Sequence, residues 1–239
     1  NNREFAHRKR SVRMRRFWSF YQNESYQVGC SGRTVYIYDK AGNELAKFRD
    51  IPYAYTAAFM PGKNIIAVKS TEGRLGFYDL DSLCLLKRIT ITRIGAQDEG
   101  FCFSPDGSFF YNIEKPITSL RTQLGVYESN TCTKESTLCA EDVRTVLRHL
   151  EFDEKTGTCY LLGYVRNDMG VRDRDFIAIF NTESQTLQDI HFISQKQYDY
   201  LAIYKHWELS GFTEKTLEWC FCDLDEKLSL KEVYEAAGS

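Results

Sequence analysis

The sequence contains no apolar run long enough to cross a membrane and no secretory pattern in its first residues. We therefore expect no membrane partner, and we expect a cytoplasmic location because no export signal is visible. The formal net charge is only -2, so no global electrostatic field favours nucleic acid. The 239 residues suffice for one domain with a sizeable core.

Motifs that carry chemistry are also missing. There is no Gly-x-Ser-x-Gly elbow, no phosphate-binding glycine loop and no calcium loop. The histidines His7, His149, His191 and His206 are scattered and do not form a His-x-x-x-His pair. We therefore predict neither a metal nor a cofactor.

Cysteine is present, but its spacing favours no metal site. Cys220 and Cys222 alternate on one predicted strand and share a face, yet no second pair at zinc spacing accompanies them. Cys132 and Cys139 flank a predicted turn, so a disulfide is an alternative. Without a secretion signal we expect reduced thiols, most of them packed as small hydrophobes.

A strand–turn–strand pattern recurs five times along the chain. Its copies span residues 34–48, 74–89, 123–138, 176–190 and 217–233. The residues that anchor the copies are Tyr38, Tyr78, Tyr127, Phe180 and Cys222, at intervals of about 40 to 53 residues. A repeat of this length predicts propeller blades of four strands each.

Composition favours strands over helices. The runs are short, rich in Val, Ile, Tyr, Phe and Thr, and bounded by turn residues. Residues 226–237 are the one segment that suits a short helix, but their place in the fifth copy predicts a strand. The fold class is therefore all-β, a ring of about five blades, or part of a six- or seven-bladed ring. We expect a basic N-terminal arm over residues 1–12 and the propeller over residues 13–239.

Each blade can be divided into its strands, with a long charged loop predicted at 166–175. The predicted strands are 13–21, 26–30, 34–39 and 44–49 in blade one; 54–60, 64–69, 75–79 and 84–91 in blade two; 100–103, 109–113, 123–128 and 131–138 in blade three; 146–152, 159–165, 176–181 and 185–190 in blade four; and, in blade five, two strands within 198–212 and two within 217–233.

The turn Phe103-Ser104-Pro105-Asp106-Gly107 resembles the turn that joins the first two strands of WD-repeat blades. The strand ending Phe77-Tyr78-Asp79 resembles the one that closes on a Trp-Asp pair, with Tyr in place of Trp. No copy ends in Trp-Asp and no Gly-His pair precedes a first strand, so the His–Asp network of true WD repeats is not expected. The resemblance implies a WD-repeat-like propeller and specifies no function.

The first sixteen residues are basic, with seven Lys or Arg between Arg3 and Arg16. We interpret them as a solvated tail that leads into the first strand. The alternative is an arm that binds phosphate or an acidic partner, which would be the only role for nucleic acid.

The fold favours a non-catalytic module that binds a protein or peptide on the loops before the first strands. Aromatic and Arg residues near the starts of blades suit a binding hot spot. The candidate binding residues are Tyr53, Tyr55, Arg93, Arg144, Tyr198, Tyr200 and Trp207. For Tyr53 and Tyr55, packing between blades is an equal alternative.

A propeller enzyme acting on a carbohydrate or small molecule is the alternative function. Such an enzyme needs carboxylates that converge in the central channel. The candidates before first strands are Asp50, Asp98, Glu99, Asp142 and Asp199. No Trp- or His-rich sugar-binding surroundings accompany them.

Overall fold

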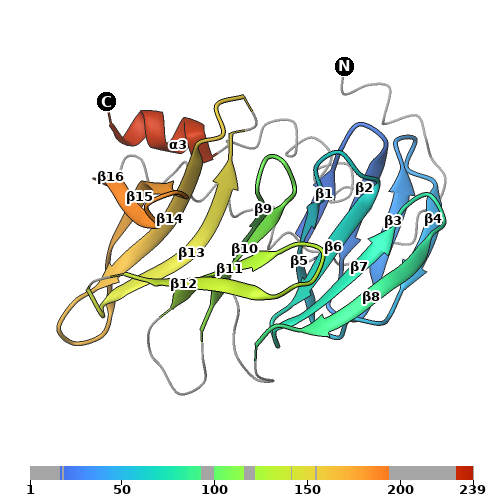
Figure 1. Cartoon of the computed structure of the whole chain (residues 1–239), viewed down its shortest axis with the longest axis horizontal. Coiled ribbons are helices and arrows are strands. Elements are labelled where there is room, and N and C mark those ends of the chain that lie inside the picture. Colours follow the sequence, from blue (N-terminus) through green and yellow to red (C-terminus); the bar gives the residue numbers. More distant parts are fainter. Residues whose placement is uncertain are drawn as a thin grey trace.

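Four antiparallel sheets of four strands each make up the part of the chain that the structure describes (Figure 1). This computed structural model describes residues 17, 19–92, 100–115, 122–140, 142–153, 155–193 and 230–238. In every sheet the strands lie in sequence order, so each sheet is one blade. The all-β class and the four-stranded blades predicted from the sequence are confirmed.

The blades share one plan, with tight turns between successive strands. Blade one holds β1 (Ser19–Gln22), β2 (Tyr26–Cys30), β3 (Val35–Asp39) and β4 (Glu44–Phe48). Blade two holds β5 (Ala54–Phe59), β6 (Ile65–Ser70), β7 (Arg74–Asp79) and β8 (Cys84–Thr90). Blade three holds β9 (Phe101–Phe103), β10 (Phe109–Glu114), β11 (Gln123–Glu128) and β12 (Lys134–Cys139). Blade four holds β13 (Thr145–Phe152), β14 (Cys159–Arg166), β15 (Arg172–Asn181) and β16 (Thr186–Phe192).

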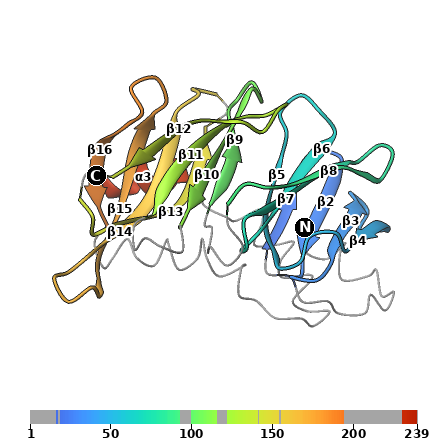
Figure 2. The same cartoon turned by 60° about the horizontal axis from the view of Figure 1, so that its bottom comes forward.

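The first strands of successive blades lie next to one another. β5 contacts both β1 and β9, and β9 contacts β13. The sheets therefore stand side by side in chain order, with their first strands inside and their fourth strands outside (Figures 1 and 2). This arrangement gives the molecule two faces. We call the upper face the one with the turns after first and third strands, and the lower face the one with the loops before first strands.

Apolar residues fill each space between blades. Val28 and Ile37 of blade one meet Ile66 and Val68 of blade two. The next two cores, between blades two and three and between blades three and four, are built in the same way. Middle strands are therefore buried on both faces and read as nearly continuous apolar runs, whereas outer strands such as β8 alternate between exposed and partly buried residues.

In blades two, three and four the aromatic anchor packs toward the preceding blade. Tyr78 stacks on Phe48 of blade one, with ring centroids 4.5 Å apart. Phe180 of blade four meets Tyr111 of blade three edge-on at 5.8 Å. The anchors thus belong to the interfaces between blades, which explains their recurrence at the blade period.

A glycine two residues before the anchor makes room for its ring in blades two and three. A Cβ built on Gly125 would lie 2.7 Å from the Tyr127 ring and 2.6 Å from a carboxylate oxygen of Glu114. Gly76 lies in the same way beneath Tyr78, at 3.2 Å. A side chain at either position would overpack the interface.

The last predicted strand of the fifth copy is wrong from residue 230 onward. Leu230–Ala237 forms the helix α3, which packs on blade four. Leu230, Val233, Tyr234 and Ala237 follow helical spacing and contact Tyr160, Leu162 and Ile177. The helix therefore covers the face of blade four that points away from blade three. Residues 198–229, which contain the rest of the predicted fifth blade, lie outside the described residues.

Two further boundaries differ from the prediction. The loop predicted at 166–175 is mostly strand, because β14 and β15 continue to the pair Arg166–Arg172 and form a long hairpin. The first strand begins at Ser19, with residues 13–16 outside the described part. Within the described residues, no helix is long and apolar enough to span a membrane.

Candidate functional site

The predicted binding residues that the structure describes lie on the lower face. Tyr53 and Arg144 directly precede the first strands of blades two and four, which lie two blades apart. Tyr55 lies within β5, half buried, and its carbonyl accepts a hydrogen bond from the Ser19 hydroxyl. The structure thus does not bring these three residues into one cluster. Arg93, Tyr198, Tyr200 and Trp207 lie outside the described residues.

Tyr53 is presented to solvent by an unusual backbone. Its φ is 57°, in the left-handed region, and its side chain is 60% exposed. Its carbonyl accepts the amide of Thr71, while the next residue, Ala54, pairs with Gly32 through two bonds of 3.1 Å. Contacts from blade one and blade two therefore hold the backbone in this conformation, with the ring outward.

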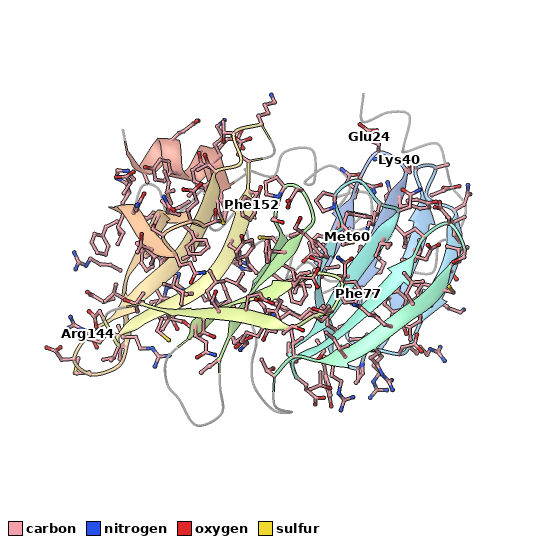
Figure 3. The ribbon with its side chains drawn as sticks, in the orientation of Figure 1. Glu24, Lys40, Met60, Phe77, Arg144 and Phe152 are labelled. Carbon is pink, nitrogen blue, oxygen red and sulfur yellow. The ribbon has the colours of Figure 1, made fainter. Side chains whose placement is uncertain are left out.

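Arg144 forms ion pairs at the lower end of blade four (Figure 3). Its guanidinium donates to both oxygens of Asp142, at 2.9 and 3.1 Å, and to Asp168 at 3.1 Å. The hydrogen bond with Asp142, above all, raises the pKa of Arg144. The ion pairs join the loop before β13 to the turn between β14 and β15.

Exposed apolar side chains surround this ion-pair group. Met169 is 83% exposed, Val143 65% and Val171 58%. The turn that carries Met169 is fixed by the Asn167 side chain, which accepts the amides of Met169 and Val171 at 3.0 Å. We call residues 142–144 and 167–171 the blade-four tip. It projects beyond the neighbouring sheets (Figure 2).

The opposite face holds a cavity of about 690 Å³, which we call the central pocket. It is lined by the ends of β5, β9 and β13 and by the turns after β1, β5 and β9. All four blades therefore contribute. Its charged residues are Glu24, Lys63 and Glu151, and its aromatic ones are Phe59, Phe103 and Phe152. Glu24 lies at the upper end in Figure 3, opposite Arg144.

Sequence reasoning did not identify the central pocket. The turns that line it, including Ser104-Pro105, were read as signals of the fold alone. The available signal was topological, because all turns between first and second strands must meet at one end of adjacent blades.

A buried polar group at the blade two–three interface has a structural role. Glu114 is 1% exposed and accepts hydrogen bonds from Tyr127, Gln123 and Lys134. Lys69, fully buried in blade two, donates to the carbonyls of Gly100 and Ile113 in blade three.

In the described part of the chain, the candidate catalytic carboxylates do not converge. Asp142 pairs with Arg144, and Asp50 lies two blades away, while Asp98, Glu99 and Asp199 are outside the described residues. No group of three His, Cys, Asp or Glu that could hold a metal occurs among the described residues. The six described cysteines are free, and burial raises the pKa of Cys30 to about 12.

Comparison with known proteins finds similarity in structure alone. No family model matches the sequence, and no curated protein matches it. The WD40 domain of Neurospora crassa Pan2 superposes with a TM-score of 0.55 at 11% identity. The match covers 74% of this chain and 52% of that one. The fold is a WD-repeat-like propeller. The chain spans about half the length of that solved structure, and the likeness extends to the fold only.

Proposed function

We propose that this WD-repeat-like propeller is a non-catalytic module that binds a protein partner through its lower face. The blade-four tip is the observation that carries the proposal. It combines three exposed apolar side chains with an ion-pair group at the projecting end of blade four. Such a patch offers a partner apolar contact area beside charged groups.

Several finer statements belong to the same proposal. Tyr53, exposed two blades away, is an accessory contact for a partner large enough to span the face. A cytoplasmic location, the division into an arm at 1–12 and a propeller at 13–239, and the roles of Arg93, Tyr198, Tyr200 and Trp207 also remain proposals.

A photo-crosslinking experiment tests the role of the tip. A photoreactive phenylalanine replaces Met169 in one protein and Leu86, which is 51% exposed on β8, in a control. We expect a discrete adduct from position 169 that position 86 does not give. The identified partner is then purified and titrated against the Val143→Ser/Met169→Ser variant.

The titration compares the affinity of the partner for the native protein and for each variant. Removing two hot-spot side chains should weaken binding by at least about tenfold, whereas Leu86→Ser should leave it unchanged. Equal adducts from both positions, or a partner whose affinity ignores the tip substitutions, would contradict the proposal.

A further inference from the structure

The lower ends of blades one and two carry a group of exposed arginines around Tyr53. Arg33 lies in the turn between β2 and β3, and Arg49 lies in the loop from β4 to β5 that also carries Tyr53. Arg88 lies near the lower end of β8. All four side chains are exposed, and we call these four residues the Tyr53 patch.

Two backbone hydrogen bonds place Arg33 beside Tyr53. They join Gly32 to Ala54 across the boundary between blades one and two, and each is 3.1 Å long. Gly32 directly precedes Arg33, and Ala54 directly follows Tyr53. The two exposed side chains therefore start from neighbouring stretches of backbone.

Arg88 reaches the same loop from the outer strand of blade two. Its guanidinium donates to the Asp50 carbonyl at 3.2 Å. Arg49 directly precedes Asp50, so Arg88 lies against the backbone from which Arg49 projects. One loop between the two blades thus has all three arginines around it.

The arginines of the patch are largely free to meet a ligand. Within the described residues, no hydrogen bond or ion pair engages the side chain of Arg33 or Arg49. Glu72, on the turn before β7, pairs with Arg74 at 3.6 Å, so its charge is already compensated. The neighbouring turn therefore adds no net negative charge to the patch.

Asp50 is the one acidic residue within the loop itself. Its carboxylate lies close enough to Tyr78 that its charge, after burial, raises the pKa of that hydroxyl. Tyr78 is fully buried between the blades, so the Asp50 carboxylate is turned toward the interface. The outward charge of the patch is positive, which favours an anionic ligand.

The backbone at Tyr53 is a second, independent observation. A φ of 57° is unfavourable for a residue with a bulky side chain. Such conformations gather at binding sites, where the surrounding fold imposes them. Here the conformation presents the ring beside the arginines, with a hydroxyl that can donate to a carboxylate.

From this combination we propose that the Tyr53 patch binds an acidic peptide segment rich in Asp and Glu. Guanidinium groups pair with carboxylates through two parallel hydrogen bonds, and Tyr and Arg are the residues most often found in binding hot spots. The inference rests on the proposed protein-binding role of the lower face. It adds the chemistry of the partner at blades one and two.

Fluorescent acidic peptides test this with the full chain. Each peptide has a matched partner in which Asn and Gln replace Asp and Glu within the same flanking sequence. We expect the acidic members to bind more tightly, and their affinity to fall at high salt because exposed charges are screened. The strongest peptide is then titrated against variants of the protein.

The charge variants assign the binding to the patch. Arg33→Gln and Arg49→Gln should each weaken it roughly threefold, and the double variant roughly tenfold. Lys40→Gln removes an exposed cation from the upper end of blade one (Figure 3) and should leave the affinity unchanged. Met169→Ser, on the blade-four tip, should also leave it unchanged.

Tyr53→Gly separates binding from folding. Gly adopts a positive φ without strain, and the lost side chain is 60% exposed, so the urea midpoint should change little. The peptide affinity should nevertheless fall by roughly fivefold or more, because a hot-spot ring is removed. An affinity that fell only together with the urea midpoint would show that Tyr53 acts through the fold and not on the ligand.

Three results would overturn the proposal. Equal binding of acidic and neutral peptides would show that no anion is selected, and equal weakening by Lys40→Gln and Arg33→Gln would show attraction to the whole molecule. A single-stranded oligothymidylate that bound more tightly than every peptide, and depended on the same arginines, would assign the patch to nucleic acid. None of these results would alter the crosslink from position 169, so the blade-four tip is tested separately.

Discussion

Glu114 shows how single residues hold a blade together. The carboxylate lies 1% exposed beneath the Tyr127 ring and accepts bonds from residues on β11 and β12. Lys134 Nζ pairs with it at 2.8 Å, and Gln123 donates at the same distance. A buried carboxylate is costly unless it is paired in this way, so the group binds three strands of blade three to one another.

Removing one hydrogen-bond donor to Glu114 should therefore lower the free energy of unfolding by a measurable amount. Tyr127→Phe keeps the ring but leaves the buried carboxylate with one bond fewer, and we expect a loss of about 1 to 3 kcal/mol in the free energy of unfolding. Tyr26→Phe, which removes an exposed bond of 3.3 Å to Asp81, should cost less than about 0.5 kcal/mol. Urea denaturation compares the two, and equal losses would show that Glu114 does not depend on Tyr127.

The contribution of Asp106 to the stability of the fold should depend on pH. Its pKa of about 2 in the folded protein lies below the ordinary 3.8 because Ser104 and Ser108 donate to it. A lowered pKa stabilises the fold above pH 4 and loses that contribution as the pH falls toward 2. The urea midpoint of the native protein should exceed that of Asp106→Asn at pH 7, and the gap should narrow by pH 3. If the difference in urea midpoint stayed constant between pH 7 and pH 3, the charge of the Asp106 carboxylate would not be the source of the stabilisation.

At the scale of elements, α3 covers one apolar face of blade four. It buries Leu230 and Val233 against blade four, and Lys231 pairs with Asp153 at 2.9 Å. Tyr234 adds ring contacts with Tyr160 and His191. Without this cover, Tyr160, Leu162 and Ile177 of blade four would be more exposed to water.

We expect the helix to contribute to global stability. Leu230→Ala should lower the free energy of unfolding by about 2 to 5 kcal/mol, as for other fully buried leucines. Glu235→Ala, on the exposed side of the same helix, should change it by less than about 0.5 kcal/mol. If Leu230→Ala changed only amide exchange within α3 and not the urea midpoint, the helix would be a detachable cover.

At the scale of the whole molecule, the apolar contacts that stabilise the fold lie between the blades. The middle strands of blades two and three send alternate residues into two different cores, so neighbouring blades share each interface. Phe110 belongs to the core between blades two and three and stacks on Tyr127 with centroids 4.8 Å apart. Nearest-neighbour contacts of this kind couple the unfolding of adjacent repeats.

Phe110→Ala should therefore destabilise more than its own blade. We expect a loss of about 3 to 5 kcal/mol and a single transition that coincides in far-UV and near-UV circular dichroism. Phe109→Ala removes the adjacent ring, which is 37% exposed, and should cost much less. Separate transitions in the two signals would show that the blades on either side unfold independently.

The sequence by itself determined the repeat and the strands of four blades. The local features are alternation of apolar residues, turn residues at fixed offsets and an aromatic anchor in each of the first four copies. They place β5 to β8 within about one residue of the prediction. Apolar residues at helical spacing were also present at 230–237, but a strand was predicted there because the segment falls in the fifth copy of the repeat. The strand prediction failed there because the tertiary contact with Tyr160, Leu162 and Ile177 selects the helix.

Only the tertiary structure decided which residues meet. Tyr53 and Arg144 hold equivalent sequence positions, because each directly precedes a first strand. In the structure they lie two blades apart, and Arg144 forms ion pairs with Asp142 and Asp168. The central pocket assembles Glu24, Lys63 and Glu151 from two turns and one strand end that are far apart along the chain. Local pattern cannot specify such a convergence, because it depends on how the sheets pack on one another.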